Sequence, residues 1–331
     1  MKKIYINDYS IYIPDSFESA GEIGLKSGLP ENIVKDKLGI NRKPVEKRLS
    51  TSDMAEQSLT KLINGGITSK EKIKFLISAG SDYKDHYIWT MAPKLLSSIG
   101  VDGAYGFDLS SQCVGSLVAL DMARSKLASM DGGTGLLSVA TKQSYIVNYN
   151  DPGSSFMFDF SDGSLAIAMS QEMGKYEIMG SSFISDGSFT DIVFSSIGER
   201  HSGQPDSSYR FLHVDPGTEW KKRMGMVSEK NFMKVIYESL ENSGISSSDI
   251  GYLAFLHTKR SFFNKVLENL GLHKENSIYL EDYGHMQGVD PFLSMRLAEE
   301  SGKISPGDYI VLVSSGTGWT WGSLVLKRTY K

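Results

Sequence analysis

Short apolar runs alternate with amphipathic helical patterns along the whole 331-residue chain. This alternation constrains the fold more than any other feature, because strands of period two and helices of period 3.6 in regular succession favour an α/β architecture. The first part of the chain predicts a helix over residues 51–62. It predicts strands over residues 3–13, 73–78, 135–140 and 160–169.

The pattern restarts after residues 196–218, a stretch rich in Ser, Gly, Pro and Asp that predicts a linker or crossover. Asp290 is expected to cap a helix that begins with Pro291. The predicted helices here are 232–243, 261–270 and 291–300, and the predicted strands are 250–256, 309–313 and 323–326. We therefore expect two α/β halves of similar rhythm, spanning 1–195 and 196–331.

Charge and hydropathy exclude several classes of protein. The net charge is −4, and no basic tract suggests a nucleic-acid partner. Asn7 and Asp8 interrupt the N-terminal apolar stretch before it resembles a signal peptide, and no run of 18 apolar residues predicts a membrane span. One cysteine allows no internal disulfide. We expect a cytoplasmic protein without a metal site, a nucleic-acid partner or a membrane partner.

The single cysteine, Cys113, lies where a strand-like segment meets a helical pattern. Phe107 begins the apolar segment, and Leu117, Leu120 and Leu127 recur at helical spacing after the cysteine. Unpaired backbone N–H groups and the helix dipole at such a position favour a thiolate, the nucleophilic form of cysteine. Cys113 is therefore a candidate nucleophile, and a small buried core cysteine is the alternative.

Two histidines and a glycine-rich turn are candidates for the rest of a site. His257 and His285 each follow a strand-like segment, where sites in α/β proteins form. Glycines from Gly316 to Gly322 could bring backbone N–H groups close to an oxyanion. The alternatives at these positions are solvated loop histidines and an ordinary β-hairpin.

Taken in order, these windows resemble the thiolase superfamily, most closely its β-ketoacyl-acyl-carrier-protein synthase III branch. Asp-Leu-Ser-Ser-Gln-Cys113-Val-Gly-Ser resembles the nucleophile segment, and Phe-Ser-Asp162-Gly-Ser resembles the Gly-Asp-Gly-Ala strand. Leu-His257-Thr-Lys is similar to Pro-His-Gln-Ala-Asn, and Tyr-Gly-His285 is similar to the Gly-Asn-Thr site. Gly-Thr-Gly318-Trp-Thr-Trp-Gly is similar to the C-terminal Gly-Gly-Gly-Phe-Thr-Trp-Gly.

The resemblance implies a thiolase fold of five αβαβα layers and a homodimer. It implies that Cys113 takes an acyl group from a thioester, and that His257 stabilises the enolate of a malonyl-type thioester after loss of CO₂. The backbone N–H groups of Cys113 and Gly318 would form the oxyanion hole. His285 stands where the branch has Asn, which gives a Cys-His-His set.

The implied substrates are acyl-CoA or acyl-carrier-protein thioesters, with no tightly bound cofactor. Residues 31–40 lack the Trp and Arg that clamp adenine in the branch, so a carrier-protein donor stays open beside coenzyme A. Asp82 resembles the acid/base carboxylate of hydroxymethylglutaryl-CoA synthases, which suggests that type of condensation as an alternative. Non-decarboxylating acyl transfer and a catalytically silent partner subunit are the other two.

Overall fold

A computed structural model describes residues 2–195 and 210–330. Within these residues, nine strands form one sheet in the order β11-β12-β13-β8-β1-β7-β6-β4-β5. The strands are β1 (Tyr5–Tyr12), β4 (Ile73–Ser78), β5 (Tyr105–Asp108), β6 (Thr134–Lys142), β7 (Asp162–Ser170), β8 (Tyr176–Ser185), β11 (Ile250–Phe255), β12 (Tyr309–Gly316) and β13 (Thr320–Arg328). Two short ribbons pair β2 (Phe17–Ser19) with β3 (Arg42–Pro44) and β9 (Val193–Ser195) with β10 (Leu212–Val214).

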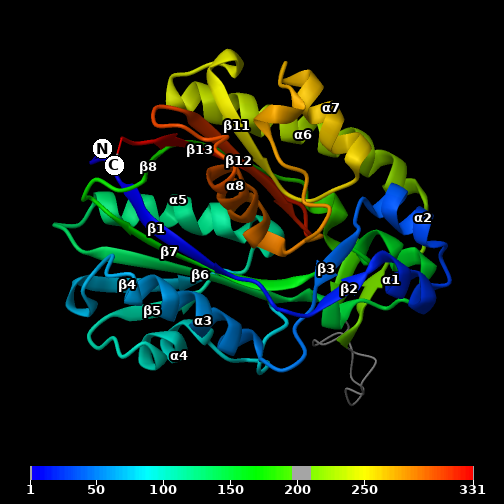
Figure 1. Cartoon of the computed structure of the whole chain (residues 1–331), viewed down its shortest axis with the longest axis horizontal. Coiled ribbons are helices and arrows are strands. Elements are labelled where there is room, and N and C mark those ends of the chain that lie inside the picture. Colours follow the sequence, from blue (N-terminus) through cyan, green and yellow to red (C-terminus); the bar gives the residue numbers. More distant parts are fainter. Residues whose placement is uncertain (1, 196–209, 331) are drawn as a thin grey trace.

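The large sheet has two parts that meet at a narrow junction. β1 pairs with β7 over most of its length, but it pairs with β8 only at Tyr5 and Ile6. The strands β5, β4, β6, β7 and β1 therefore form one part, and β8, β13, β12 and β11 form the other. The two parts diverge from the junction and enclose a helical layer (Figure 1).

Helices α5 (Gly115–Ala128) and α8 (Asp290–Glu300) lie between the two parts of the sheet (Figure 1). Helices α3 (Thr51–Asn64) and α4 (Met91–Ser98) cover the outer face of one part, and α6 (Glu219–Ser243) and α7 (Arg260–Asn269) cover the other. The short helices α1 (Ala20–Ser27) and α2 (Glu31–Ile33) lie beside the site end. The predicted five-layer αβαβα arrangement is confirmed.

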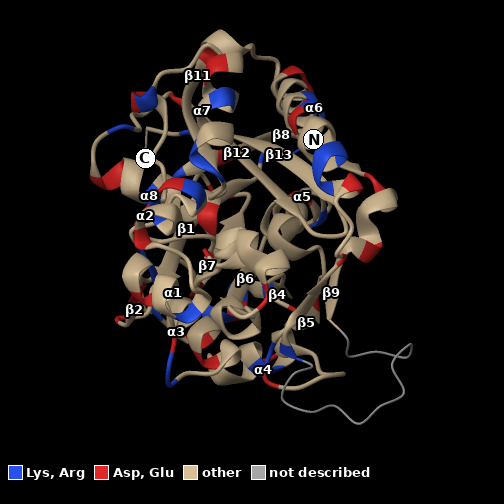
Figure 2. Ribbon diagram, turned by 90° about the vertical axis from the view of Figure 1, so that its right-hand side faces the viewer, with Lys and Arg blue, Asp and Glu red and all other residues tan. Residues whose placement is uncertain are grey.

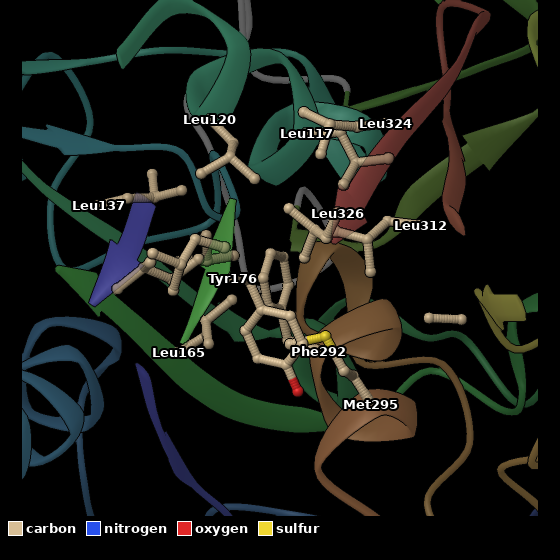
Figure 3. Close-up of a cluster of buried hydrophobic side chains, with 14 of the residues drawn as sticks. Leu117, Leu120, Leu137, Leu165, Tyr176, Phe292, Met295, Leu312, Leu324 and Leu326 are labelled. Atoms are coloured by element: carbon tan, nitrogen blue, oxygen red, sulfur yellow. The ribbon is translucent and has the colours of Figure 1, made fainter. Parts of the chain in front are cut away.

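The middle layer is apolar because both of its faces are covered by sheet. Leu117 and Leu120 of α5 pack with Phe292 and Met295 of α8, and every one of these side chains is fully buried (Figure 3). Leu137 and Leu165 come from one part of the sheet, and Leu312, Leu324 and Leu326 come from the other (Figure 3). This packing fixes the helix that follows Cys113 against both parts of the sheet.

Most predicted elements are confirmed, and three expectations differ from the structure. Helix α6 begins at Glu219 and not at residue 232. The predicted linker lies partly outside the described residues, at 196–209, and its described remainder contains β10. Asp290 is wrong as a helix cap, because it is the first residue inside α8 and its side chain turns away from the helix N-terminus. The division at residue 195 stays a prediction.

Charged residues are distributed without a dominant sign. Figure 2 shows Lys and Arg interspersed with Asp and Glu along the elements, in keeping with the net charge of −4. Among the helices of the described residues, none combines the length and the apolar character needed to cross a membrane.

Candidate active site

Cys113 lies in a 3₁₀ turn, Gln112–Val114, that leads directly into α5. Its carbonyl oxygen accepts a hydrogen bond of 2.7 Å from Ser314 Oγ at the end of β12. Gly316 lies so close that a Cβ there would be 2.5 Å from the Ser111 carbonyl oxygen and 3.1 Å from the Cys113 nitrogen. Gln112 has a φ of 49°, a conformation that costs energy in a non-glycine residue. The turn is thus held tightly from the β12–β13 hairpin.

His285 is the histidine that contacts the thiol. Its Nε2 lies 3.1 Å from Cys113 Sγ, and its Nδ1 lies 2.6 Å from Asp290 Oδ2. The His285 backbone N–H donates to the Asp159 carbonyl oxygen at 2.9 Å. Gly284 permits this approach, because its φ is 63° and a Cβ would be 2.3 Å from that same oxygen. The three side chains form a nucleophile–imidazole–carboxylate series.

Asp290 organises both histidines instead of capping a helix. Its Oδ1 accepts a hydrogen bond from the Met286 backbone N–H at 2.6 Å. Its Oδ2 accepts one from the His257 backbone N–H at 2.8 Å in addition to its contact with His285 Nδ1. The carboxyl group is fully buried and each of its oxygens has a donor, so it is suited to remain ionised.

The charge on His285 depends on its neighbours. Burial of the ring favours the neutral imidazole, but the Cys113 thiolate and the Asp290 carboxylate favour the imidazolium more strongly. The pKa of His285 therefore lies well above its ordinary value. An imidazolium beside the sulfur is the arrangement expected of an activated cysteine.

His257 lies in a different environment. Its ring is fully buried, and its Nε2 lies 3.0 Å from the Leu38 carbonyl oxygen and 3.5 Å from Asp159 Oδ2. A carbonyl can only accept, so the hydrogen is assigned to Nε2. Nδ1 has no hydrogen-bond partner among the described residues. Burial lowers the pKa of His257, although Asp159 and Asp290 oppose this, and the ring stays neutral.

Gly318 and Asp82 reach the same cavity as Cys113 from two sides. Gly318 lies in the hairpin between β12 and β13, and its carbonyl oxygen accepts a 2.6 Å hydrogen bond from Thr190 Oγ1. Asp82 Oδ2 accepts hydrogen bonds of 2.6 Å from both Ser110 Oγ and Gln112 Nε2. Asp82 thereby contacts the residue that precedes the cysteine.

Three further residues were not anticipated from the sequence. Gln143, directly after β6, places Nε2 3.9 Å from Cys113 Sγ. Phe160 stacks against the His285 ring at a centroid distance of 5.3 Å. Asp159, between Phe158 and Phe160, lies buried beside His257. A charged residue between two phenylalanines at the start of a buried strand was the signal available for Asp159.

Two cavities meet at the site, and Phe160 lines both. The first, of about 500 Å³, is lined by Asp159, His257 and His285, and farther out by Trp220 and by lysines. The second, of about 470 Å³, is lined by Cys113 and by apolar side chains. The lysines of the first are Lys37, Lys221 and Lys259, and the apolar residues of the second include Ile146, Val193, Phe194 and Leu212.

Comparison with known proteins gives consistent relatives. The chain is 25% identical over 331 residues to β-ketoacyl-[acyl-carrier-protein] synthase III of Clostridium perfringens, covering 99% of this chain and 100% of that protein. It is 27% identical to the synthase III of Microcystis aeruginosa, covering 95% and 94%. The crystal structure of 3-oxoacyl-[acyl-carrier-protein] synthase III from Aquifex aeolicus superposes with a TM-score of 0.86 at 21% identity, covering 98% and 99%.

Two family models match separate segments of the chain. The model of 3-oxoacyl-[acyl-carrier-protein] synthase III matches residues 107–187, which contain Cys113. The model of the synthase III C-terminal part matches residues 240–328, which contain His257, His285 and Gly318. Together the two matches cover just over half of the chain. The nucleophile turn, the paired histidines and the five layers therefore have one source: the chain belongs to the synthase III family of the thiolase superfamily, and it is a condensing acyltransferase.

Proposed function

We propose that this enzyme works through an acyl thioester on Cys113. The observation that carries the proposal is the position of the His285 imidazole, 3.1 Å from Sγ on one side and 2.6 Å from Asp290 on the other. Such a series supplies a thiolate for attack on a thioester carbonyl and keeps the imidazole in one orientation.

The tetrahedral oxyanion of the acylation step would be held by the backbone N–H groups of Cys113 and Gly318. Support comes from the second cavity, which both residues line, and from the close approach of Gly316 to the Cys113 nitrogen. Fixed amide donors of this kind stabilise charge that develops in the transition state. The apolar walls of that cavity would accommodate the acyl chain.

In the second half-reaction, a malonyl-type thioester would lose CO₂ and the resulting carbanion would attack the acyl group. His257 is the residue that we expect to contact the enolate oxygen. To do so, its Nε2 hydrogen would have to leave the Leu38 carbonyl oxygen. The cavity that His257 shares with His285 and Asp159 is the space available for this substrate.

Acyl-CoA and acyl-carrier-protein thioesters are the proposed substrates, without a tightly bound cofactor. Both carry their phosphates on a long flexible arm, and Lys37, Lys221 and Lys259 line the first cavity where such an arm would lie. Trp220 lines the same cavity and offers an aromatic face to an adenine. The arm would therefore enter past these residues and bring its thioester to Cys113.

A second candidate is non-decarboxylating acyl transfer to an oxygen or nitrogen nucleophile. The contact between His285 and Asp290 favours it, because an imidazole oriented by a carboxylate can act as a general base for such a nucleophile. A hydroxymethylglutaryl-type condensation through Asp82 is less well supported, since Asp82 Oδ2 already accepts two hydrogen bonds. Membership of a family of enzymes speaks against a silent subunit.

We also propose a cytoplasmic homodimer. Tyr87 and Ile88 are 70% and 89% exposed on the loop that borders the cavity of Cys113, and association of two copies would cover such apolar side chains. The mixed surface charge gives no support to a nucleic-acid partner.

The experiment that separates the two candidates uses malonyl thioester labelled in its free carboxylate. Enzyme that has been acylated beforehand is mixed with the labelled substrate, and the released CO₂ is counted against the 3-ketoacyl product. Equal amounts of CO₂ and product support condensation. Acylated enzyme that releases no CO₂ but passes its acyl group to an alcohol or amine would contradict condensation and support the second candidate.

A further inference from the structure

Three buried aspartates surround the site, and two of them are fully supplied with donors. Asp290 accepts hydrogen bonds from two backbone N–H groups and from His285. Asp162 accepts hydrogen bonds from the Ser144 backbone N–H, the Ser144 hydroxyl and the Glu46 backbone N–H. Both carboxylates can therefore remain charged in the interior.

Asp159 has no comparable set of donors. Its Oδ1 is buried without a hydrogen-bond partner among the described residues. Its Oδ2 lies 3.5 Å from His257 Nε2, whose hydrogen points to the Leu38 carbonyl oxygen at 3.0 Å. An ionised carboxylate without donors is costly to bury, whereas a neutral carboxylic acid is much less so.

The nearest cation does not compensate. Lys43 is fully buried, and its Nζ donates to the Phe158 carbonyl oxygen at 2.7 Å and lies 3.5 Å from Glu18. The other titratable groups that face Asp159 are His257, His285, Asp290, Tyr149 and Tyr279. Burial raises the pKa of Asp159, and it outweighs the opposite effects of His257, His285 and Lys43. Asp159 therefore retains its proton to a higher pH than an ordinary aspartate.

The first cavity also lacks a free donor near its inner end. His285 uses Nε2 on Cys113 and Nδ1 on Asp290, and His257 uses Nε2 on Leu38. A protonated Asp159 lines this cavity beside both histidines. Its O–H is thus the side-chain donor there that is not already engaged.

We propose that Asp159 is a catalytic residue of the condensation step, donating a hydrogen bond from its carboxylic acid to the enolate oxygen of the malonyl-type thioester. This inference rests on the proposed function. The bond between C2 and the carboxylate of the malonyl group breaks, CO₂ leaves, and the electron pair forms the enolate. C2 then attacks the acyl carbonyl, the new C–C bond forms, and the C–S bond breaks to return the Cys113 thiolate. Asp159 keeps its proton throughout.

The test compares D159N and D159L with the wild type and with D131N, a matched control at an exposed aspartate that pairs with Lys2. Each protein is first acylated, and the acyl group on Cys113 is measured by mass spectrometry. CO₂ release from malonyl thioester is then followed across pH. Acylation of the variants shows that the fold and the nucleophile are intact.

We expect D159L to acylate normally and to lose CO₂ release by roughly a hundredfold or more, the usual cost of removing one such donor. D159N keeps a donor that does not titrate, so it should retain release and lose the decline at high pH that the wild type shows. Release by D159L at the wild-type rate, a high-pH decline unchanged in D159N, or loss of acylation in D159L would each overturn the proposal. Absence of acylation in the wild type would instead contradict the proposed function itself.

Discussion

The carboxylate of Asp290 lies 2.6 Å from Nδ1 of His285, on the side of the ring opposite the Cys113 sulfur. The same oxygen accepts the His257 backbone N–H, so one buried side chain sets the positions of both histidine segments. The β12–β13 hairpin fixes the cysteine independently, through Ser314 and Gly316. The site is therefore assembled from both parts of the sheet.

Replacing Asp290 with Asn should slow acylation of Cys113 by the order of 100-fold, the lower end of what a positioned acid–base group contributes. The carboxylate helps to hold the pKa of His285 above its ordinary value, so its loss lowers that pKa. The imidazolium is then lost at a lower pH, and the alkaline limit of acylation moves in the same direction.

Labelled-histidine NMR measures this effect directly. In the wild type, His285 should titrate well above an ordinary histidine, and in D290N and C113A it should titrate lower, because each variant removes one of the anions beside the ring. An ordinary titration in the wild type that neither variant changes would show that the pair is not charged.

Substituting Gly316 with Ala should impair acylation, because the new Cβ would press on the Ser111 carbonyl oxygen and the Cys113 nitrogen. The matched control is Gly187→Ala, where a Cβ would meet only Thr190 Oγ1 at 3.9 Å. The rate of acyl-enzyme formation is measured for both variants. Equal rates in the two would argue against a strict requirement for glycine beside the nucleophile.

Leu120→Ala should destabilise the fold by about 3 kcal/mol, since truncating a fully buried leucine leaves a cavity between closely packed layers. The free energy of unfolding, obtained from denaturant titration, measures the effect. Leu25→Ala is the control on an 88% exposed side chain and should change this free energy little. A similar small change for both variants would contradict the packing described for the middle layer.

The strands and the middle helices were predictable because burial imposes a regular pattern on them. Helix α6 shows the limit of this approach. Its buried residues begin at Asn231, so the turns from Glu219 onward carry no apolar stripe that would indicate a helix. The length of this helix is determined by the protein around it.

The candidate site was predictable where motifs carried it, as at Cys113, His257, His285 and Gly318. Asp290 was interpreted as a cap, since an Asp before Pro at a helix start usually has that role. Its contact with His285 depends on how residues 285–290 turn back, which no local pattern reveals. Asp159 was missed because its importance comes from having no partner, a property of the fold and not of the sequence.

Mass spectrometry of the intact protein and of its Cys113 peptide, after exposure to a panel of acyl-CoA and acyl-carrier thioesters, tests the central claim most directly. The account predicts that one acyl group is added to the Cys113 peptide of the wild type and that the addition is absent from Cys113→Ala. An acyl group that persists in Cys113→Ala, or a wild-type protein that no thioester acylates, would contradict it.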